Sequence, residues 1–240
     1  MTDVKNHPVV SHDKWIDARV ALLKKEKEFT RLKDDIARQR RELPWEKVEK
    51  KHVLTGPKGK EALADLFENR SQLIVYHFMF DPSWDAGCPH CSHAADSFDG
   101  IIVHLNQRDA TMVAVSLAPY DKLAAYEKRM GWSFKWLSAS DADFNFDYRV
   151  SFTPEELAKK KANYNFAMQD PGPPQREGIS VFYKNASSEI FHTYSAYARG
   201  IEIVMVDYQY LDLLPKGRNE DGRGPFWVKR HDEYDSVPRG

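Results

Sequence analysis

The two cysteines of this chain, Cys88 and Cys91, form one Cys-x-x-Cys motif between a strand pattern and a helix pattern. Residues 71–80, before the motif, form a nearly continuous apolar run, which is typical of a strand buried on both faces. After Cys88 the apolar residues recur at helical spacing as far as Leu105. Because the chain has no other thiol, no disulfide framework holds its fold together. The motif therefore predicts an α/β fold with one reactive centre at the start of a helix.

Strand and helix patterns alternate along the chain and lead to a hairpin and a closing helix. The predicted elements are, in chain order, a strand at 53–54, a helix at 60–68, a strand at 71–80, a helix opening at Cys88, a strand at 111–117, a helix at 119–130, a helix start at 153–156, hairpin strands at 179–183 and 190–194, and a last helix at 201–211. The βαβ order predicts parallel strands, and the hairpin adds antiparallel ones. We therefore expect a mixed central sheet flanked by helices.

A long amphipathic helix pattern precedes the α/β region, with apolar residues at Trp15, Leu22, Phe29 and Ile36. This seven-residue spacing within residues 11–41 is typical of a helix with one apolar stripe. We expect the stripe to pack on the helix's own domain. The alternative is a dimerisation arm, because about four heptads are just enough for a coiled coil. A homodimer is therefore kept as a second interpretation.

Charge and hydropathy exclude several classes of protein. Lys and Arg total 35 and Asp and Glu total 36, which gives a net charge of -1, so we predict no nucleic-acid partner. No apolar run approaches the roughly 18–20 residues that span a bilayer, and the first residues lack a signal-peptide pattern. We therefore expect a cytoplasmic protein without a membrane partner. In that compartment a Cys-x-x-Cys motif is more often redox-active or metal-binding than a structural disulfide.

The sequence Cys88-Pro89-His90-Cys91 has the chemistry of a reactive dithiol. A helix N-terminus stabilises a thiolate, Pro89 suits the first helical position, and His90 adds a tunable positive charge. Two intervening residues at a helix start bring the sulfurs close enough for a disulfide. We predict that Cys88 attacks a protein or small-molecule disulfide and that Cys91 resolves the mixed disulfide. No cofactor is needed, because the dithiol itself carries two electrons.

The arrangement of strand, Trp, Cys-x-x-Cys and helix resembles the thioredoxin fold, and Cys-Pro-His-Cys is similar to the active site of periplasmic disulfide oxidases. The whole chain resembles a bacterial family of thioredoxin-like proteins, which are predicted dithiol-disulfide oxidoreductases of otherwise unknown function. The matching stretches are LIVYHFMFDPSWDAGCPHCS, RMGWSFKWLSASDADFNFDY, FHTYSAYARGIE and LDLLPKGR. The resemblance implies an N-terminal helical extension (1–45), a thioredoxin-like domain (46–215) and a C-terminal tail (216–240), which we expect to be extended or partly ordered.

The resemblance also implies roles for residues around the motif. Cys88 matches the exposed nucleophile of thioredoxins, and Cys91 matches the buried resolving cysteine. His77 falls where thioredoxins place a buried acid that helps to deprotonate the second cysteine, although a merely structural histidine is an equal alternative. The predicted substrate-binding residues are Trp84, Asp85 and Pro89. Thioredoxins place a cis-proline before the first hairpin strand, whereas this chain has Arg176-Glu177-Gly178 there, which departs from thioredoxin-like substrate handling.

A non-enzymatic metal-binding or partner-binding module is the main alternative. Cys88, His90, Cys91 and His93 form a Cys-x-His-Cys-x-His run of zinc-type ligands. A structural zinc site usually takes further ligands from elsewhere in the chain. The available candidates are His104, His192 and His231.

A peroxiredoxin-like peroxide reductase is the third interpretation. Peroxiredoxins carry a proline seven residues and a threonine three residues before their cysteine. Asp81 and Asp85 occupy those positions here. This interpretation therefore lacks its hydroxyl donor, and Asp85 would repel a thiolate unless it is paired.

Overall fold

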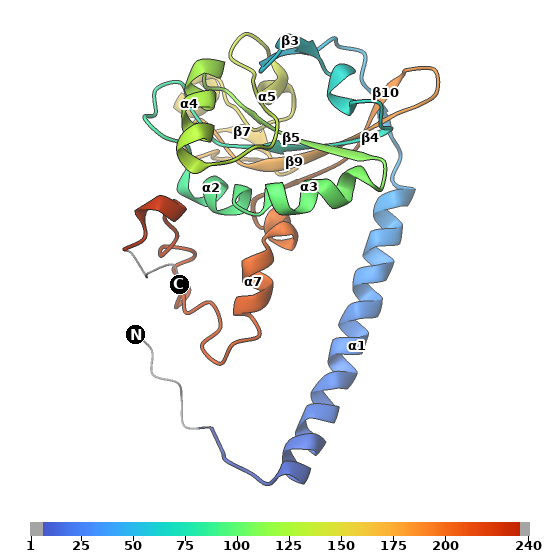
Figure 1. Ribbon diagram of the computed structural model, residues 1–240, viewed down its shortest axis with the longest axis vertical. Coiled ribbons are helices and arrows are strands. Elements are labelled where there is room, and N and C mark those ends of the chain that lie inside the picture. The colour runs from blue at the N-terminus through green and yellow to red at the C-terminus, as the bar shows by residue number, and fades with distance from the viewer. Residues whose placement is uncertain (1–6, 236–240) are drawn as a thin grey trace.

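The computed structural model describes residues 7–235, which form a large mixed sheet, a small two-stranded sheet and flanking helices (Figure 1). The strands, in chain order, are β1 (Glu46–Lys47), β2 (Val53–Gly56), β3 (Gly59–Ala62), β4 (Gln72–His77), β5 (Ala110–Ser116), β6 (Trp136–Ser138), β7 (Ala162–Tyr164), β8 (Ala167–Gln169), β9 (Gly178–Lys184) and β10 (Ile190–Tyr197). The helices are α1 (His12–Glu42), α2 (Pro89–Ala95), α3 (Phe98–Asn106), α4 (Tyr120–Met130), α5 (Phe144–Asp147), α6 (Pro154–Ala158) and α7 (Val206–Leu211), with 3-10 turns η1 (Asp65–Phe67), η2 (Ala198–Val204) and η3 (His231–Glu233).

The large sheet has the strand order β1-β10-β9-β4-β5-β6-β2-β3. At its centre, β4 and β5 are parallel and are connected through α2 and α3, as expected for a βαβ unit. The hairpin β9–β10 then adds antiparallel strands beside β4. A βαβ unit followed by an antiparallel hairpin and a closing helix is the thioredoxin-like arrangement. The predicted fold class is therefore confirmed.

Each face of the central sheet has its own core. Tyr76 and Phe78 contribute to a cluster that also contains buried residues of α2, α3, α4 and α7. Val75, one position away from Tyr76, belongs to a second cluster with η1 and α5. Successive residues of a strand point to opposite faces of the sheet, so neighbouring positions of β4 enter different cores. This alternation decides which β4 side chains reach the cysteines.

Helix α1 does not pack on the domain as we expected. It spans 31 residues, and none of them is buried. Figure 1 shows α1 running away from the body of the molecule, to which it connects only at its C-terminal end. There the Arg40 guanidinium lies 5.4 Å from the centre of the Tyr194 ring, and Trp45 packs on Phe191 just beyond the helix. The prediction that the apolar stripe covers its own domain is wrong, and the homodimer remains a prediction.

The predicted helix at 60–68 is wrong as well. The chain turns back between Gly56 and Gly59, so β2 and β3 pair as an antiparallel hairpin. Gly59 has a φ of 90°, in the region that favours glycine. Only a single 3-10 turn follows, and it buries Leu66 and Phe67 completely. The apolar residues of this segment thus lie in a 3-10 turn and pack into the second core.

Other boundaries also differ from the sequence pattern. The helix predicted from Cys88 is two helices, because α2 ends before Ser97 and α3 starts after it. The last predicted helix is 3-10 turn η2 followed by the short helix α7. The aromatic stretch between α4 and α6 supplies β6 and α5, which were not predicted. No helix in the described part of the chain is both long and apolar enough to cross a membrane.

The capping box at the start of α6 confirms the helix start predicted at residues 153–156. The Glu156 N–H donates to Thr153 Oγ1 at 3.2 Å, and the Thr153 N–H donates to the Glu156 carboxylate at 2.8 Å. We expect Thr153→Ala to lower the free energy of unfolding by about 1 kcal/mol, measured by urea denaturation. Glu155→Ala removes an exposed carboxylate of the same turn and should cost only a few tenths of a kcal/mol. Equal losses in the two variants would contradict the cap.

Candidate active site

Cys88 and Cys91 lie at the start of α2, after the loop that leaves β4. Cys88 immediately precedes the helix and is partly buried, whereas Cys91 is only 1% exposed. The Cys88 N–H donates to the Met79 carbonyl at 3.0 Å, and the Ser92 N–H donates to the Cys88 carbonyl at 2.9 Å. Neither cysteine is in a disulfide bond. The backbone thus fixes both sulfurs on one turn, with Cys88 as the more accessible one.

Gly87 lets the chain approach the aromatic core directly before the motif. A Cβ atom at this position would lie 2.7 Å from Phe78 Cε1 and 3.0 Å from Tyr126 Cε1. The Tyr126 hydroxyl is in turn 2.8 Å from the Ser92 hydroxyl, inside α2. A larger residue at position 87 would push α2 away from this core. The position of Cys88 therefore depends on aromatic packing beneath it.

Hydrogen bonds to its sulfur make Cys88 a thiolate at neutral pH. The Cys91 thiol donates to the Cys88 sulfur, and this contact, with a second hydrogen bond from His90, lowers the pKa of Cys88 to about 4. In return, the bond to Cys88 raises the pKa of His90 above its usual value, so the imidazolium is favoured. A thiolate is the nucleophilic form of cysteine. The catalytic roles of Cys88 and His90 remain predictions.

The pKa of Cys91 is shifted in the opposite direction from that of Cys88. Burial, followed by its bond to Cys88, raises the pKa of the Cys91 thiol well above the usual value. Its sulfur accepts the Met79 N–H at 3.4 Å, and it is also hydrogen-bonded to the Tyr76 side chain. Burial raises the pKa of Tyr76 as well, which keeps its hydroxyl protonated as a donor. Cys91 is therefore a protonated thiol, and two hydrogen-bond donors point toward its sulfur.

His77 does not serve Cys91, and that prediction is wrong. Its Nε2 atom lies 2.9 Å from the Ser180 hydroxyl, and its ring stacks near Phe144 and Tyr148 in the second core. Burial lowers the pKa of His77 to about 3, so the ring is neutral. The residue on the cysteine face is Tyr76, one position earlier. The sequence does not single out Tyr76, because a continuous apolar run does not show which residues face which side of the sheet.

His77 instead begins a buried chain of hydrogen bonds across the sheet. Ser180 and Ser195 are joined through their hydroxyls at 2.9 Å, and Ser195 lies 2.7 Å from His192 Nε2. His192 Nδ1 is 3.4 Å from the Glu46 carboxylate at the sheet edge. The pairing of β10 with β9 shifts by one residue between His192 and Tyr194. These polar groups belong to the face opposite the cysteines.

Residues 218–235, which we call the C-terminal strap, fold over the start of α2. His90 Nε2 donates to the Pro225 carbonyl at 3.2 Å, and Arg230 donates two hydrogen bonds to the Gly87 carbonyl at 3.0 and 2.7 Å. In Figure 1 this red segment lies beside α2, with α7 next to it. The strap thus holds the imidazole that faces Cys88.

Ion pairs and an aromatic contact fix the strap to the rest of the domain. His231 Nδ1 lies 2.6 Å from the Asp96 carboxylate, and Arg129 of α4 binds Asp232 at 2.7 Å. The Trp227 ring packs at 5.6 Å against His93 of α2. Residues 216–235 are therefore not extended, because they fold back onto α2 and α4 through turns and one 3-10 turn. Residues 236–240 lie outside the described part of the chain.

A cavity of about 880 Å³ opens between the dithiol and the strap. The apolar part of its lining comes from β4, the following loop, η2 and α7, namely Tyr76, Met79, Ile201, Met205 and Tyr208. The reactive part consists of Cys88, His90 and Cys91. The charged part consists of Arg176, Glu177, Arg199, Glu202, Arg218 and Glu220. The cavity therefore presents the dithiol to a site with both apolar and charged walls.

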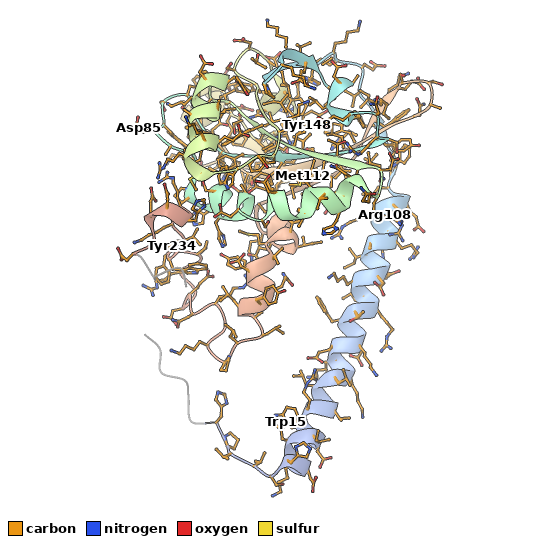
Figure 2. The ribbon with its side chains drawn as sticks, viewed as in Figure 1. Trp15, Asp85, Arg108, Met112, Tyr148 and Tyr234 are labelled. Atoms are coloured by element: carbon orange, nitrogen blue, oxygen red, sulfur yellow. The ribbon has the colours of Figure 1, made fainter. Side chains whose placement is uncertain are left out.

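The three predicted substrate-binding residues are not among the residues that line this cavity. Trp84 packs against the first core from the loop after β4. Asp85 is exposed, and Figure 2 shows it at the margin of the molecule. Pro89 occupies the first position of α2, as predicted. Arg176 and Glu177 do line the cavity, and their only sequence signal was their place before the hairpin, where thioredoxins have a proline.

The described residues do not assemble the donors of the metal alternative. His93 Nε2 binds the Asp207 carboxylate at 2.8 Å, and His192 belongs to the opposite face of the sheet. Within residues 7–235 no group of three or more His, Cys, Asp or Glu side chains is placed to hold a metal ion. Asp81 and Asp85, which occupy the proline and threonine positions of the peroxidase alternative, are not among the residues that line the cavity.

Several solved structures are similar to the chain. Peroxidoxin BcpB from Mycobacterium tuberculosis has 14% identity and a TM-score of 0.45, over 68% of this chain and 94% of that one. Xanthomonas campestris peroxiredoxin Q has 12% identity and a TM-score of 0.45, over 69% and 92% of the two chains. A putative thiol:disulfide interchange protein DsbE from Chlorobium tepidum has 12% identity and a TM-score of 0.43, over 70% and 94%.

Comparison with curated proteins gave no match. A family model described as "Bacterial protein of unknown function (DUF899)" matches residues 4–234, nearly the whole length of the chain. This agrees with the resemblance found in the sequence. The chain belongs to this bacterial family.

Proposed function

We propose that this protein is a dithiol-disulfide oxidoreductase with Cys88 as nucleophile and Cys91 as resolving cysteine. The observation that carries the proposal is the hydrogen-bonded group of Cys88, His90 and Cys91, in which one sulfur is a thiolate and the other a buried thiol. A pair of cysteines with separated pKa values divides the two steps of exchange between them. The more accessible sulfur is also the one that carries the charge.

The proposed reaction needs no group beyond the two thiols. The Cys88 thiolate attacks one sulfur of a substrate disulfide, forming a mixed disulfide and releasing a thiolate, which takes up a proton. Cys91 then loses its proton and attacks the Cys88 sulfur. The protein ends as the Cys88–Cys91 disulfide, and the second substrate thiol leaves. An external dithiol restores the reduced protein, so two electrons pass from that dithiol to the substrate.

Two donors near Cys91 support the second step. The negative charge on Cys91 develops in a buried place, where an unpaired charge would be costly. Tyr76 and the Met79 N–H point toward that sulfur and stabilise the charge as it forms. Once Cys88 is in the mixed disulfide, its charge no longer opposes ionisation of Cys91. The first step thereby prepares the second.

The proposal is tested by trapping the intermediate in Cys91→Ser. We expect this variant to form a stable mixed disulfide with bis(2-hydroxyethyl) disulfide, located on Cys88 by peptide mass spectrometry. Without a resolving thiol, the adduct should persist until an external thiol is added. Wild-type protein treated in the same way should instead give the internal disulfide. Absence of an adduct in the variant, with no internal disulfide in the wild type, would reject the proposed function.

A further inference from the structure

The C-terminal strap limits what can reach the dithiol. Pro225 of the strap is bonded to His90, and the strap residues Arg218, Glu220 and Gly222 line the cavity that contains Cys88. The cavity volume of about 880 Å³ lies within the roughly 300–1,000 Å³ that is usual for small-molecule sites. A disulfide carried on a protein chain would have to displace the strap and its bonds to Gly87. The cavity therefore fits a small substrate.

Arg176 is the available cation of the cavity wall. Arg199 and Arg218 are both engaged, since they bind Glu202 at 2.8 Å and Asp212 at 2.9 Å. Arg176 forms no ion pair with any described residue. Its Nε–H donates to the Pro171 carbonyl at 2.8 Å. Its terminal N–H groups thus remain free to bind a carboxylate in the two-point manner that guanidinium groups favour.

Rigid contacts hold Arg176 in place on the cavity wall. Its guanidinium carbon lies 5.2 Å from the centre of the Tyr164 ring, in a cation–π contact. The Arg176 N–H also donates to the Val150 carbonyl at 2.8 Å, which fixes the backbone. A side chain that is already ordered loses little conformational freedom when it binds a ligand. Arg176 is therefore a preorganised anion site.

Glu177 supplies the opposite charge next to the dithiol. It forms no ion pair within residues 7–235, and its carboxylate meets the Tyr164 hydroxyl only at 3.5 Å. Its negative charge reaches the reactive group, because it contributes to the raised pKa values of Cys91 and His90. A carboxylate that lines the same cavity as the Cys88 thiolate disfavours a substrate with net negative charge. It favours a substrate that brings an ammonium group.

We propose that the cavity takes a small disulfide with amino-acid ends, whose carboxylate binds Arg176 and whose ammonium group binds Glu177. This inference rests on the proposed function. With cystine as the substrate, the Cys88 thiolate attacks one sulfur and releases one cysteine. Cys91 then releases the second cysteine and forms the internal disulfide. The reduced protein thus loses two electrons to cystine, and an external dithiol restores it.

The test compares cystine with the neutral bis(2-hydroxyethyl) disulfide in single turnovers of the reduced full-length protein. Quenched samples give the rate of internal disulfide formation as a function of disulfide concentration. For Arg176→Gln we expect the half-saturating cystine concentration to rise by about tenfold or more, with little change in the limiting rate. The rates with the neutral disulfide should stay as in the wild type. Glu177→Gln should also raise the half-saturating concentration of cystine more than that of the neutral disulfide.

Arg108→Gln is the matched control, because it removes the same charge from an exposed residue outside the cavity. Figure 2 shows Arg108 at the far end of α3, beside α1. This variant should form the internal disulfide at wild-type rates with both substrates. Equal effects of Arg176→Gln on the two disulfides would overturn the inference and leave the proposed function intact. Faster oxidation by the protein disulfide of insulin than by cystine would do the same. A wild-type protein that none of the three disulfides oxidises would overturn both.

Discussion

Cys88→Ser should lose disulfide exchange by at least about a thousandfold, because a serine hydroxyl is not ionised at neutral pH and cannot replace a thiolate. The measurement is the single-turnover rate with bis(2-hydroxyethyl) disulfide. Serine differs from cysteine by one atom, so packing around residue 88 should change little. A circular dichroism spectrum and urea midpoint close to the wild type would show that the loss is chemical.

Cys91→Ser is the control for this experiment, because it removes the other sulfur from the same turn. It should still release the first thiol from the disulfide, and only the second release should fail. The two variants therefore separate the two steps. If Cys91→Ser lost the first step and Cys88→Ser kept it, the roles of the two cysteines would be reversed.

The second large effect is on pH dependence. With a Cys88 pKa of about 4, the first step of exchange should stay nearly constant from neutral pH down to about pH 5. A thiol with the ordinary pKa of about 8.5 would lose about five-hundredfold in thiolate between pH 8.5 and 5.5. Titration of the thiolate's ultraviolet absorbance in the wild-type protein measures the Cys88 pKa, because the raised pKa of Cys91 keeps that thiol protonated. A midpoint at or above about 8.5 would contradict an activated nucleophile.

His90→Ala tests the side-chain hydrogen bond that, beside those from Cys91, holds the Cys88 pKa low. Loss of the imidazolium should raise the pKa of Cys88 and move the fall in rate to higher pH. His93→Ala removes a histidine of the same helix that is bonded to Asp207, so it should leave the midpoint in place. Equal shifts in the two variants would mean that the effect comes from disturbing α2 in general.

The same lowered pKa links stability to redox state. The folded pKa of Cys88 lies below the unfolded value, so its contribution to stability is present above the unfolded pKa and is lost as pH falls through about 4. The internal disulfide has no thiolate and lacks this contribution. At neutral pH the reduced form should therefore be the more stable one, with a higher urea midpoint, and this difference should shrink toward pH 4.

Local patterns predicted much of the fold. The apolar run before Cys88, the helical spacing after it and the hairpin at 179–194 all mark contacts between neighbouring elements. The capping box at Thr153 needs only four consecutive residues. The prediction failed where the pattern was the same at every position or where there was no pattern. The run at 71–80 has apolar residues at every position, so the sequence offered no reason to choose Tyr76 over His77.

Contacts between distant parts of the chain could not be predicted. The strap is rich in Gly, Arg and Asp and shows no periodicity, yet Pro225 meets His90 across 135 positions. The cavity likewise depends on Arg176 and Glu177, which come close to the dithiol only because β9 pairs with β4. Such placement follows from sheet topology and from single hydrogen bonds. Neither leaves a repeating signal in the sequence.

The shifted register of β10 decides which of its side chains meet on one face of the sheet. In a regular strand, residues three positions apart point to opposite faces, so His192 and Ser195 could not meet. The extra residue, Thr193, restores them to one face, where they join the buried chain that starts at His77. If β10 paired regularly with Thr193 included in the ladder, either His192 or Ser195 would turn toward the cysteines, and the hydrogen bond between them would be lost.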